Sequence, residues 1–175
     1  PARTVKIDAE ERRAFQLLQL LTAKPVLYVC NVDESAAAEG NELSARVFAR
    51  AEAEGAAAVV VSAKIESEVA MLSDEAEKRD FLEALGLEET GLTRVIRAGY
   101  SLLDLLTFFT VGPKEARAWT VRKGATAPQA AGVIHTDFER GFIRAETIAF
   151  DDYITCGGES EARAAGKLRM EGKEY

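Results

Sequence analysis

Two short apolar runs constrain the fold of this chain more than any other feature. Residues 26–30 read VLYVC after Pro25, residues 56–61 read AAAVVV, and neither run contains a charged side chain. Runs that are apolar at every position are typical of strands buried on both faces of a parallel sheet. Between them, residues 41–54 hold apolar side chains at helical spacing, and Gly55 follows as a helix C-cap. The order strand, helix, strand predicts a right-handed parallel crossover.

Polar residues follow each predicted strand. The first run is followed by NVDE at residues 31–34, and the second by SAK at residues 62–64. Because the carboxyl ends of parallel strands share one edge of the sheet, where ligands bind in open α/β folds, we expect Asn31 and Ser62 to be neighbours in space. This edge is the candidate site. The alternative is that Asn and Asp are simply common after strands.

An N-x-x-D/E turn after one buried strand, with S-A-K after the next, resembles the base-recognition half of P-loop GTPase-type domains. NVDE has valine and glutamate where the usual N-K-x-D has lysine and aspartate, and in this it is similar to the YchF, or Obg-like ATPase, family. The resemblance implies that the Asn orders the loop, that the acidic residue contacts the edge of the base, and that the SAK backbone lies beside it. The implied base-binding residues are Asn31, Val32, Glu34, Ser62, Ala63 and Lys64.

From residue 106 the pattern changes. LTFFTVG alternates, a turn follows at Gly112 and Pro113, and ARAWTV at residues 116–121 reads as the returning strand. We then expect a helix over 127–138, a strand over 143–150, a helical turn over 162–166 and a strand beginning within 167–175. This is the order of a small ubiquitin-like β-grasp. LLTFFTVGPKEARAWTVRKG and AAGVIHTDFERGFIRAE closely resemble the TGS domain that ends YchF proteins.

The expected fold class is therefore α/β, the C-terminal part of a P-loop NTPase parallel sheet, followed by a small α+β β-grasp domain. Residues 1–22 would be the return helix of a helical insert, capped by Asp8 and Glu11. Residues 23–105 would be the C-terminal half of the nucleotide-binding domain, with helices over 66–85 and 91–106. Residues 106–175 would be the TGS domain, with its final strand truncated and its sheet edge unpaired.

No G-x-x-x-x-G-K-[ST] motif occurs in the sequence, so these residues do not include the phosphate cradle of a P-loop protein. The resemblance implies ATP as substrate, and a Mg²⁺ ion and catalytic residues that lie upstream of this chain. No residue here is therefore named as catalytic or metal-binding. We expect the chain to be inactive on its own.

The chain is acidic, with a net charge of −7, yet residues 106–150 carry six basic and four acidic side chains. Basic side chains on one face favour contacts with phosphates, and the alternative is an ordinary solvated face. The resemblance favours RNA, since TGS domains recur in proteins that work on tRNA or ribosomes and YchF proteins are ribosome-associated. The expected RNA- or ribosome-contacting residues are Lys114, Arg117, Arg122, Lys123, Arg140 and Arg144.

Other features of the sequence indicate the cellular compartment. No apolar run approaches the ~20 residues of a membrane span, and Cys30 and Cys156 have no disulfide or zinc pattern, so we expect a reduced, cytoplasmic protein. Cys30 is either a small hydrophobe or a thiol that senses oxidation beside the nucleotide. His135 has no Ser, Cys or metal partner in pattern, so we expect a surface, capping or RNA-contacting side chain.

Two functions remain. The first is a ribosome-associated P-loop protein that binds the large subunit and hydrolyses ATP in preference to GTP, with neither membrane nor DNA as a partner. The second is a non-catalytic module that binds RNA or a regulatory nucleotide. A P-loop in the sequence upstream would discriminate between them.

Overall fold

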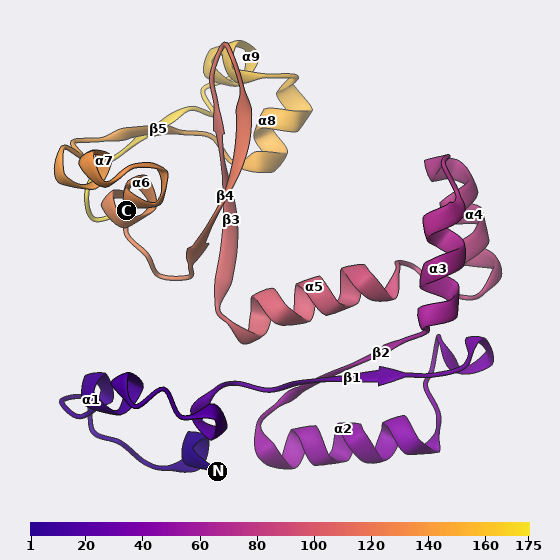
Figure 1. Ribbon diagram of the computed structural model, residues 1–175. Coiled ribbons are helices and arrows are strands. Elements are labelled where there is room, and N and C mark those ends of the chain that lie inside the picture. Colours follow the sequence, from indigo (N-terminus) through magenta and orange to yellow (C-terminus); the bar gives the residue numbers. More distant parts are fainter. The chain divides into compact units, whose positions relative to one another are not determined.

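The computed structural model describes the whole chain, Pro1–Tyr175, and divides it into two compact units. The first unit is Pro1–Leu103 and the second is Asp104–Tyr175 (Figure 1). No helix in either unit is long and apolar enough to cross a membrane.

A parallel pair of strands lies at the centre of the first unit. β1 (Leu27–Asn31) pairs with β2 (Ala57–Val61), and Asn31 lies opposite Val61 at the carboxyl ends. The predicted parallel pairing is confirmed. Burial on both faces was expected for the two strands, but Val29 of β1 is 50% exposed whereas Val60 of β2 is 8% exposed. The helices over residues 42–54 and 91–102 both pack more closely on β2 than on β1, which leaves Val29 with fewer packing partners than Val60.

Helix α2 (Glu42–Glu54) connects the two strands (Figure 1). Asn41 caps its start, because the Asn41 side chain accepts a hydrogen bond from Ser44 N while the Ser44 hydroxyl accepts one from Asn41 N. Gly55 ends the helix in the left-handed conformation, at φ 65°, which a glycine adopts without steric cost. The predicted bounds of this helix are confirmed to within one residue.

Three helices follow β2: α3 (Ala63–Met71), α4 (Glu75–Ala84) and α5 (Gly91–Leu102). The prediction of one helix over 66–85 is wrong. The chain becomes extended at Leu72, and the Asp74 carboxylate then accepts a hydrogen bond from Ala76 N to start a new helix.

The helix predicted over residues 91–106 is also too long. α5 ends at Leu102, and Asp104 takes a positive φ of 51°, which interrupts the helical backbone just before the next strand begins. The buried core of this unit lies between α3, α4 and the segments beside them. It consists of Ala37, Ile65, Val69, Leu82 and Leu87.

The amino-terminal segment contains α1 (Arg12–Leu17) and two short 3₁₀ helices, η1 (Ala2–Thr4) and η2 (Leu21–Ala23). The predicted capping box of Asp8 and Glu11 does not form, since no side chain caps α1. Instead, the backbone carbonyl of Asp8 accepts hydrogen bonds from Glu11 N and Arg12 N. The turn that precedes the helix therefore uses the main chain of Asp8.

The second unit is also a mixture of helices and strands, with two antiparallel pairs. β3 pairs with β4 over seven residues each, and β5 pairs with β6 over three. The predicted hairpin and its turn are confirmed. The elements are β3 (Leu105–Val111), β4 (Ala116–Arg122), α6 (Ala127–Ile134), α7 (Thr136–Arg140), β5 (Ala145–Thr147), α8 (Phe150–Cys156), α9 (Glu159–Ala164) and β6 (Arg169–Glu171).

Two predicted elements of this unit are wrong in extent. The helix over 127–138 is interrupted at His135, whose backbone is extended and whose Nδ1 accepts a hydrogen bond from Asp137 N at 3.2 Å. His135 is thus a capping residue, one of the roles expected for it. The strand over 143–150 is limited to β5, because α8 begins at Phe150 with Asp151 and Asp152 in its first turn, where carboxylates are favourable.

Candidate nucleotide-base site

The segments that follow β1 and β2 meet at one edge of the sheet. The side-chain oxygen of Asn31 accepts a hydrogen bond from Ala63 N at 3.0 Å, and Val32 N donates to Val61 O at 2.9 Å. The neighbourhood predicted from the crossover is therefore present. The Asn31 bond joins the NVDE segment to the SAK segment across 32 positions of sequence.

Asn31 keeps hydrogen-bonding capacity beyond this contact. Its side chain is exposed, and its amide NH₂ group still offers two donors when the oxygen is occupied by Ala63 N. The amide oxygen also has a second lone pair. Asn31 can therefore hold the two loops together and contact a ligand at the same time.

Glu34 and Lys64 form an ion pair across the same edge. Lys64 Nζ lies 2.6 Å from Glu34 Oε2 and 3.9 Å from Glu68 Oε1. Glu34 begins the 3₁₀ helix η3 (Glu34–Ala36), and Lys64 lies in the first turn of α3. The hydrogen bond from Lys64 to Glu34, and then the charge of Glu34, raise the pKa of the Lys64 ammonium above its ordinary value. Lys64 is thus fully charged at neutral pH.

Sequence reasoning gave Lys64 only a backbone role and missed this ion pair. The pairing of Lys64 with Glu68 is readable from their spacing of four residues in a helix. The pairing with Glu34 is not, because it depends on the register of two strands and on where each turn leads. The available signal was a pair of opposite charges just after two strands predicted to be adjacent.

Ser62 differs from the other residues of the site. It is 2% exposed, its hydroxyl is buried without a hydrogen-bond partner, and it does not cap α3 although it holds the N-cap position. A buried hydroxyl without a partner is destabilising. In this conformation, Ser62 therefore offers its backbone and not its hydroxyl to a ligand.

Glu66, which sequence reasoning did not single out, connects the site to α5. Its two carboxylate oxygens accept hydrogen bonds from Gly91 N at 2.6 Å and from Leu92 N at 3.1 Å. The backbone approaches closely here, since a Cβ atom on Gly91 would lie 3.0 Å from the side chain of Val61. Glu66 thereby fixes the start of α5 against the end of β2.

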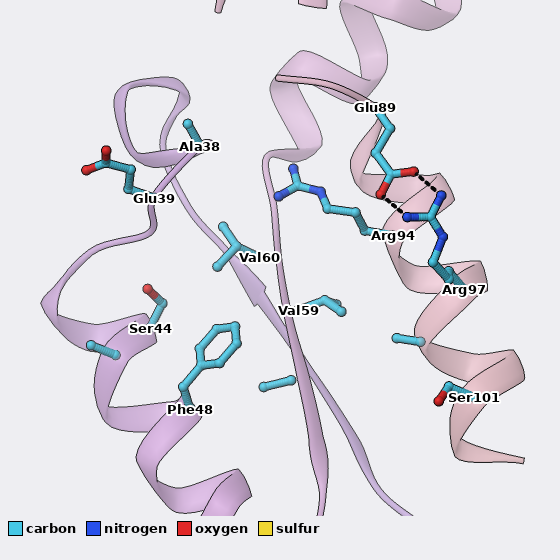
Figure 2. Close-up of a pocket in the computed structure, with 13 residues that line it drawn as sticks. Ala38, Glu39, Ser44, Phe48, Val59, Val60, Glu89, Arg94, Arg97 and Ser101 are labelled. Atoms are coloured by element: carbon cyan, nitrogen blue, oxygen red, sulfur yellow. Dashed lines mark hydrogen bonds and ion pairs between the residues drawn. The ribbon is translucent and has the colours of Figure 1, made fainter. Parts of the chain in front are cut away.

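A separate hollow of about 790 Å³ lies between α2, β2 and α5 (Figure 2). Phe48 and Arg94 point toward it from opposite walls, with Val60 between them. Arg94 is only weakly bonded, because both of its terminal nitrogens lie 3.5 Å from Ala37 O and its Nε has no partner. None of the six predicted base-binding residues lines this hollow.

The six basic residues expected to contact RNA are all exposed, and none makes an ion pair with a carboxylate. They do not form one face. Alternation along β4 places Arg117 and Arg122 on opposite faces of the strand. Lys123 follows directly, Lys114 lies in the turn between β3 and β4, Arg140 ends α7, and Arg144 precedes β5.

Trp119 is a feature of this unit that sequence reasoning missed. The Arg117 guanidinium lies over the Trp119 ring, 4.2 Å from its centre, and Trp119 Nε1 donates to Thr110 Oγ1 at 2.8 Å. The available signal was the single tryptophan of the chain, two residues after an arginine in a predicted strand. Stacked aromatic and arginine groups of this kind occur where proteins bind single-stranded nucleic acid.

The two cysteines are the remaining candidate residues. Cys30 in β1 and Cys156 in α8 are both free and half-buried. No group of three or more His, Cys, Asp or Glu residues lies together in a way that could hold a metal ion.

Comparison with known proteins gives consistent likenesses. A family model, YchF-GTPase_C, described as a protein of unknown function (DUF933), matches residues 105–175. The chain is 54% identical to the ribosome-binding ATPase YchF of Bacillus subtilis, over 100% of this chain and 48% of that protein. It is 58% identical to the protein of the same name from Haemophilus ducreyi, over 99% of this chain and 47% of the relative.

A solved structure shows the same relationship. The structure of the Schizosaccharomyces pombe YchF GTPase matches with a TM-score of 0.81 and 35% sequence identity, over 99% of this chain and 46% of the other. The chain spans about half the length of the curated relatives it matches, and the matching half is the C-terminal one. The resemblance inferred from NVDE, SAK and the phrases after residue 106 is thus confirmed: residues 105–175 match the YchF family model, and the whole chain is similar to the C-terminal half of YchF proteins.

Proposed function

We propose that this chain supplies the adenine-binding edge and the ribosome-contacting domain of a longer protein that hydrolyses ATP. The observation that carries the proposal is the hydrogen bond from Ala63 N to Asn31, which brings the NVDE and SAK segments together at the carboxyl ends of two parallel strands. Ligands of open α/β sheets bind at such an edge. The name of the bacterial relatives, ribosome-binding ATPase, supports the same reading.

The proposal assigns a role to each part of the chain. Residues 1–22 return from a helical insert, residues 23–105 are the C-terminal half of the nucleotide-binding domain, and residues 106–175 are a TGS domain of the β-grasp type. The division into two units after Leu103 and the family match over 105–175 support the last boundary. The hairpin, helix and further strand pair of the second unit support the β-grasp order.

The preferred nucleotide is ATP. The names of the relatives differ here, since the bacterial proteins are called ATPases and the Schizosaccharomyces pombe protein a GTPase. Guanine presents two adjacent donors, which the aspartate of N-K-x-D accepts as a pair. Glu34 is one methylene longer than aspartate, so its carboxylate is displaced from that position, and Val32 cannot brace the base as a lysine stem does. A lost bond to a charged acceptor costs about 1.5 to 3 kcal/mol, or roughly tenfold to a hundredfold in affinity.

The residues of this chain bind and orient the base, and they do not act on the phosphates. Phosphoryl transfer requires a P-loop backbone, its lysine and a Mg²⁺ ion. Together these stabilise the charge of the transferring group. The proposal places these groups in residues outside this chain. We therefore expect no ATP hydrolysis above background by Pro1–Tyr175 alone.

Contact with the ribosome belongs to the second unit in this proposal. The exposed and unpaired arginines and lysines of residues 114–144 match the phosphates of RNA in the large subunit, and the stack of Arg117 on Trp119 suits an unpaired base. This role places the protein in the cytoplasm, with neither a membrane nor DNA as a partner.

Replacing Asn31 by Ala in the full-length protein that carries this chain tests the proposal. The change removes the bond to Ala63 N, so the dissociation constant for a non-hydrolysable ATP analogue should rise about tenfold while ribosome binding stays unchanged. Asn41→Ala is the matched control, because Asn41 caps α2 and lies outside the edge. Equal effects of the two variants on ATP binding would contradict the proposal and favour a module that binds no nucleotide.

A further inference from the structure

The Lys64–Glu34 ion pair occupies the place where the base-reading carboxylate of the site would be free. Lys64 Nζ holds Glu34 Oε2 at 2.6 Å, and the second carboxylate of the region, Glu68, is 3.9 Å away. The Lys64 side chain is 65% exposed and that of Glu34 is 40% exposed, so both remain within reach of a ligand. The edge thus presents a donor and an acceptor side by side.

The two purine bases differ in what such a pair can bind. The hydrogen-bonding edge of guanine carries two adjacent donors, N1–H and the 2-amino group, and needs two free carboxylate oxygens. Adenine carries one donor, the 6-amino group, next to one acceptor, N1. A bare carboxylate repels the acceptor N1 of adenine, whereas an ammonium group, which only donates, repels the N1–H of guanine.

Building on the proposed nucleotide function, we infer that Lys64 is the residue that selects adenine over guanine. The ammonium keeps one of its three donors on Glu34 and offers another to adenine N1, while the free oxygen of Glu34 accepts from the 6-amino group. Guanine would place its N1–H donor against the ammonium, where it needs an acceptor. Its two donors would also find a Glu34 carboxylate with one oxygen already bound to Lys64. Selection then follows from the ion pair, and not from the length of Glu34 alone.

One further observation supports a role for Lys64 at the base. Asn31 is held by Ala63 N, so the residue next to Lys64 fixes the first loop and the ammonium comes to the edge from a defined start of α3. This contact holds the two loops together before a ligand arrives, and the ion pair joins Lys64 to Glu34 across them.

The test is the substitution Lys64→Met in the full-length protein, with dissociation constants for non-hydrolysable ATP and GTP analogues measured by calorimetry. Methionine keeps the apolar stem and removes the ammonium, so ATP should bind more weakly and GTP more tightly. The ratio of the two dissociation constants should shift toward GTP by about tenfold or more. Lys64→Arg, which keeps a charged donor, should retain the preference for ATP.

Lys78→Met is the matched control, because Lys78 makes an ion pair of the same length with Glu75 on α4. It should leave the ratio unchanged, as should Glu68→Gln, which removes only the distant partner. A Lys64→Met protein that melts like the wild type and keeps its ratio would overturn this inference and leave the proposed ATP site intact. A wild-type protein that binds neither analogue would overturn both.

Discussion

Two buried serines show how much the surroundings of one residue decide its contribution. Ser44 is 4% exposed, and its hydroxyl accepts a hydrogen bond from Asn41 N and donates one to Asn41 O, both at 2.8 Å. Ser62 is 2% exposed, and its hydroxyl has no partner. Because the residue type and the burial are the same, Ser44 and Ser62 differ in the hydrogen bonding of their hydroxyl groups.

Ser44→Ala and Ser62→Ala should therefore differ in stability. Loss of the capping box at Ser44 should lower the free energy of unfolding by about 1 kcal/mol, because it leaves Asn41 N without its partner. Ser62→Ala should raise it by about 1 kcal/mol, since no hydrogen bond is lost and the desolvation cost of a buried hydroxyl without a partner is removed. Urea denaturation of the two variants measures both values. Equal losses would show that the Ser62 hydroxyl has a partner in solution.

At the scale of elements, Glu54 joins three parts of the first unit. From the end of α2, its carboxylate accepts hydrogen bonds from the hydroxyl of Tyr28 in β1 at 2.9 Å and from Arg3 in η1 at 3.2 Å. Arg50, one turn earlier in α2, is also bound to it. The hydrogen bond from Tyr28 and then that from Arg50 lower the pKa of Glu54 below its ordinary value of 4.5.

This lowered pKa makes stability depend on acid. A carboxyl group with a lowered pKa in the folded state stabilises the fold fully above its unfolded value of 4.5, and this contribution is lost as the pH falls through the folded value. Tyr28→Phe removes the largest cause, so the variant should melt at a lower temperature at pH 7 but lose less on acidification to pH 3. Thermal unfolding at several pH values measures this. Parallel curves for wild type and variant would contradict the assignment to Glu54.

The start of α5 yields another prediction at this scale. A Cβ atom on Gly91 would lie 3.0 Å from Val61 Cβ and from Glu66 Oε1, whereas nothing lies within 4 Å of one on Gly99 in the same helix. Gly91→Ala should therefore destabilise by about 1 to 3 kcal/mol. Gly99→Ala should stabilise by up to about 1 kcal/mol, because alanine favours helix. Denaturant midpoints separate the two, and a stabilised Gly91→Ala would rule out the close packing of α5 on β2.

Element prediction from the sequence succeeded where one local signal was strong. Gly55 ends α2, and the apolar run of residues 56–61 contains β2, as the sequence pattern indicates. The break at Leu72 was missed because apolar periodicity continues from α3 into α4, and the stop at His135 was missed for the same reason. Side-chain caps by Asp74 and His135 decide both breaks, and helical periodicity does not report them.

At the scale of the whole molecule, the pairing of β1 with β2 was predictable because crossovers have one hand and one sheet edge. The residues at the carboxyl edge of the sheet could be predicted from this pairing. The ion pair of Lys64 with Glu34 and the stack of Arg117 on Trp119 did not, since both depend on side-chain positions set by turns and strand alternation. The relation of the basic residues to one another was likewise beyond the sequence, because Arg117 and Arg122 face opposite ways.

Ribosome contact can be tested at this scale with two triple variants of the second unit. Neutralising Arg117, Arg122 and Lys123, which have no acidic partners, should weaken ribosome binding and flatten its salt dependence, because each released counterion contributes to the slope. The matched control neutralises Arg163, Lys167 and Arg169, which pair with carboxylates already. Binding measured across a salt series should change only for the first variant. Equal changes in both would mean that net charge alone governs binding.

The edge formed by Asn31 and Lys64 is proposed to receive adenine. A crystal structure of the full-length protein with a non-hydrolysable ATP analogue tests it most directly. The base should lie between these two residues, with Lys64 Nζ near adenine N1 and the bond from Ala63 N to Asn31 retained. A base bound elsewhere, such as in the hollow lined by Phe48 and Arg94, would contradict it.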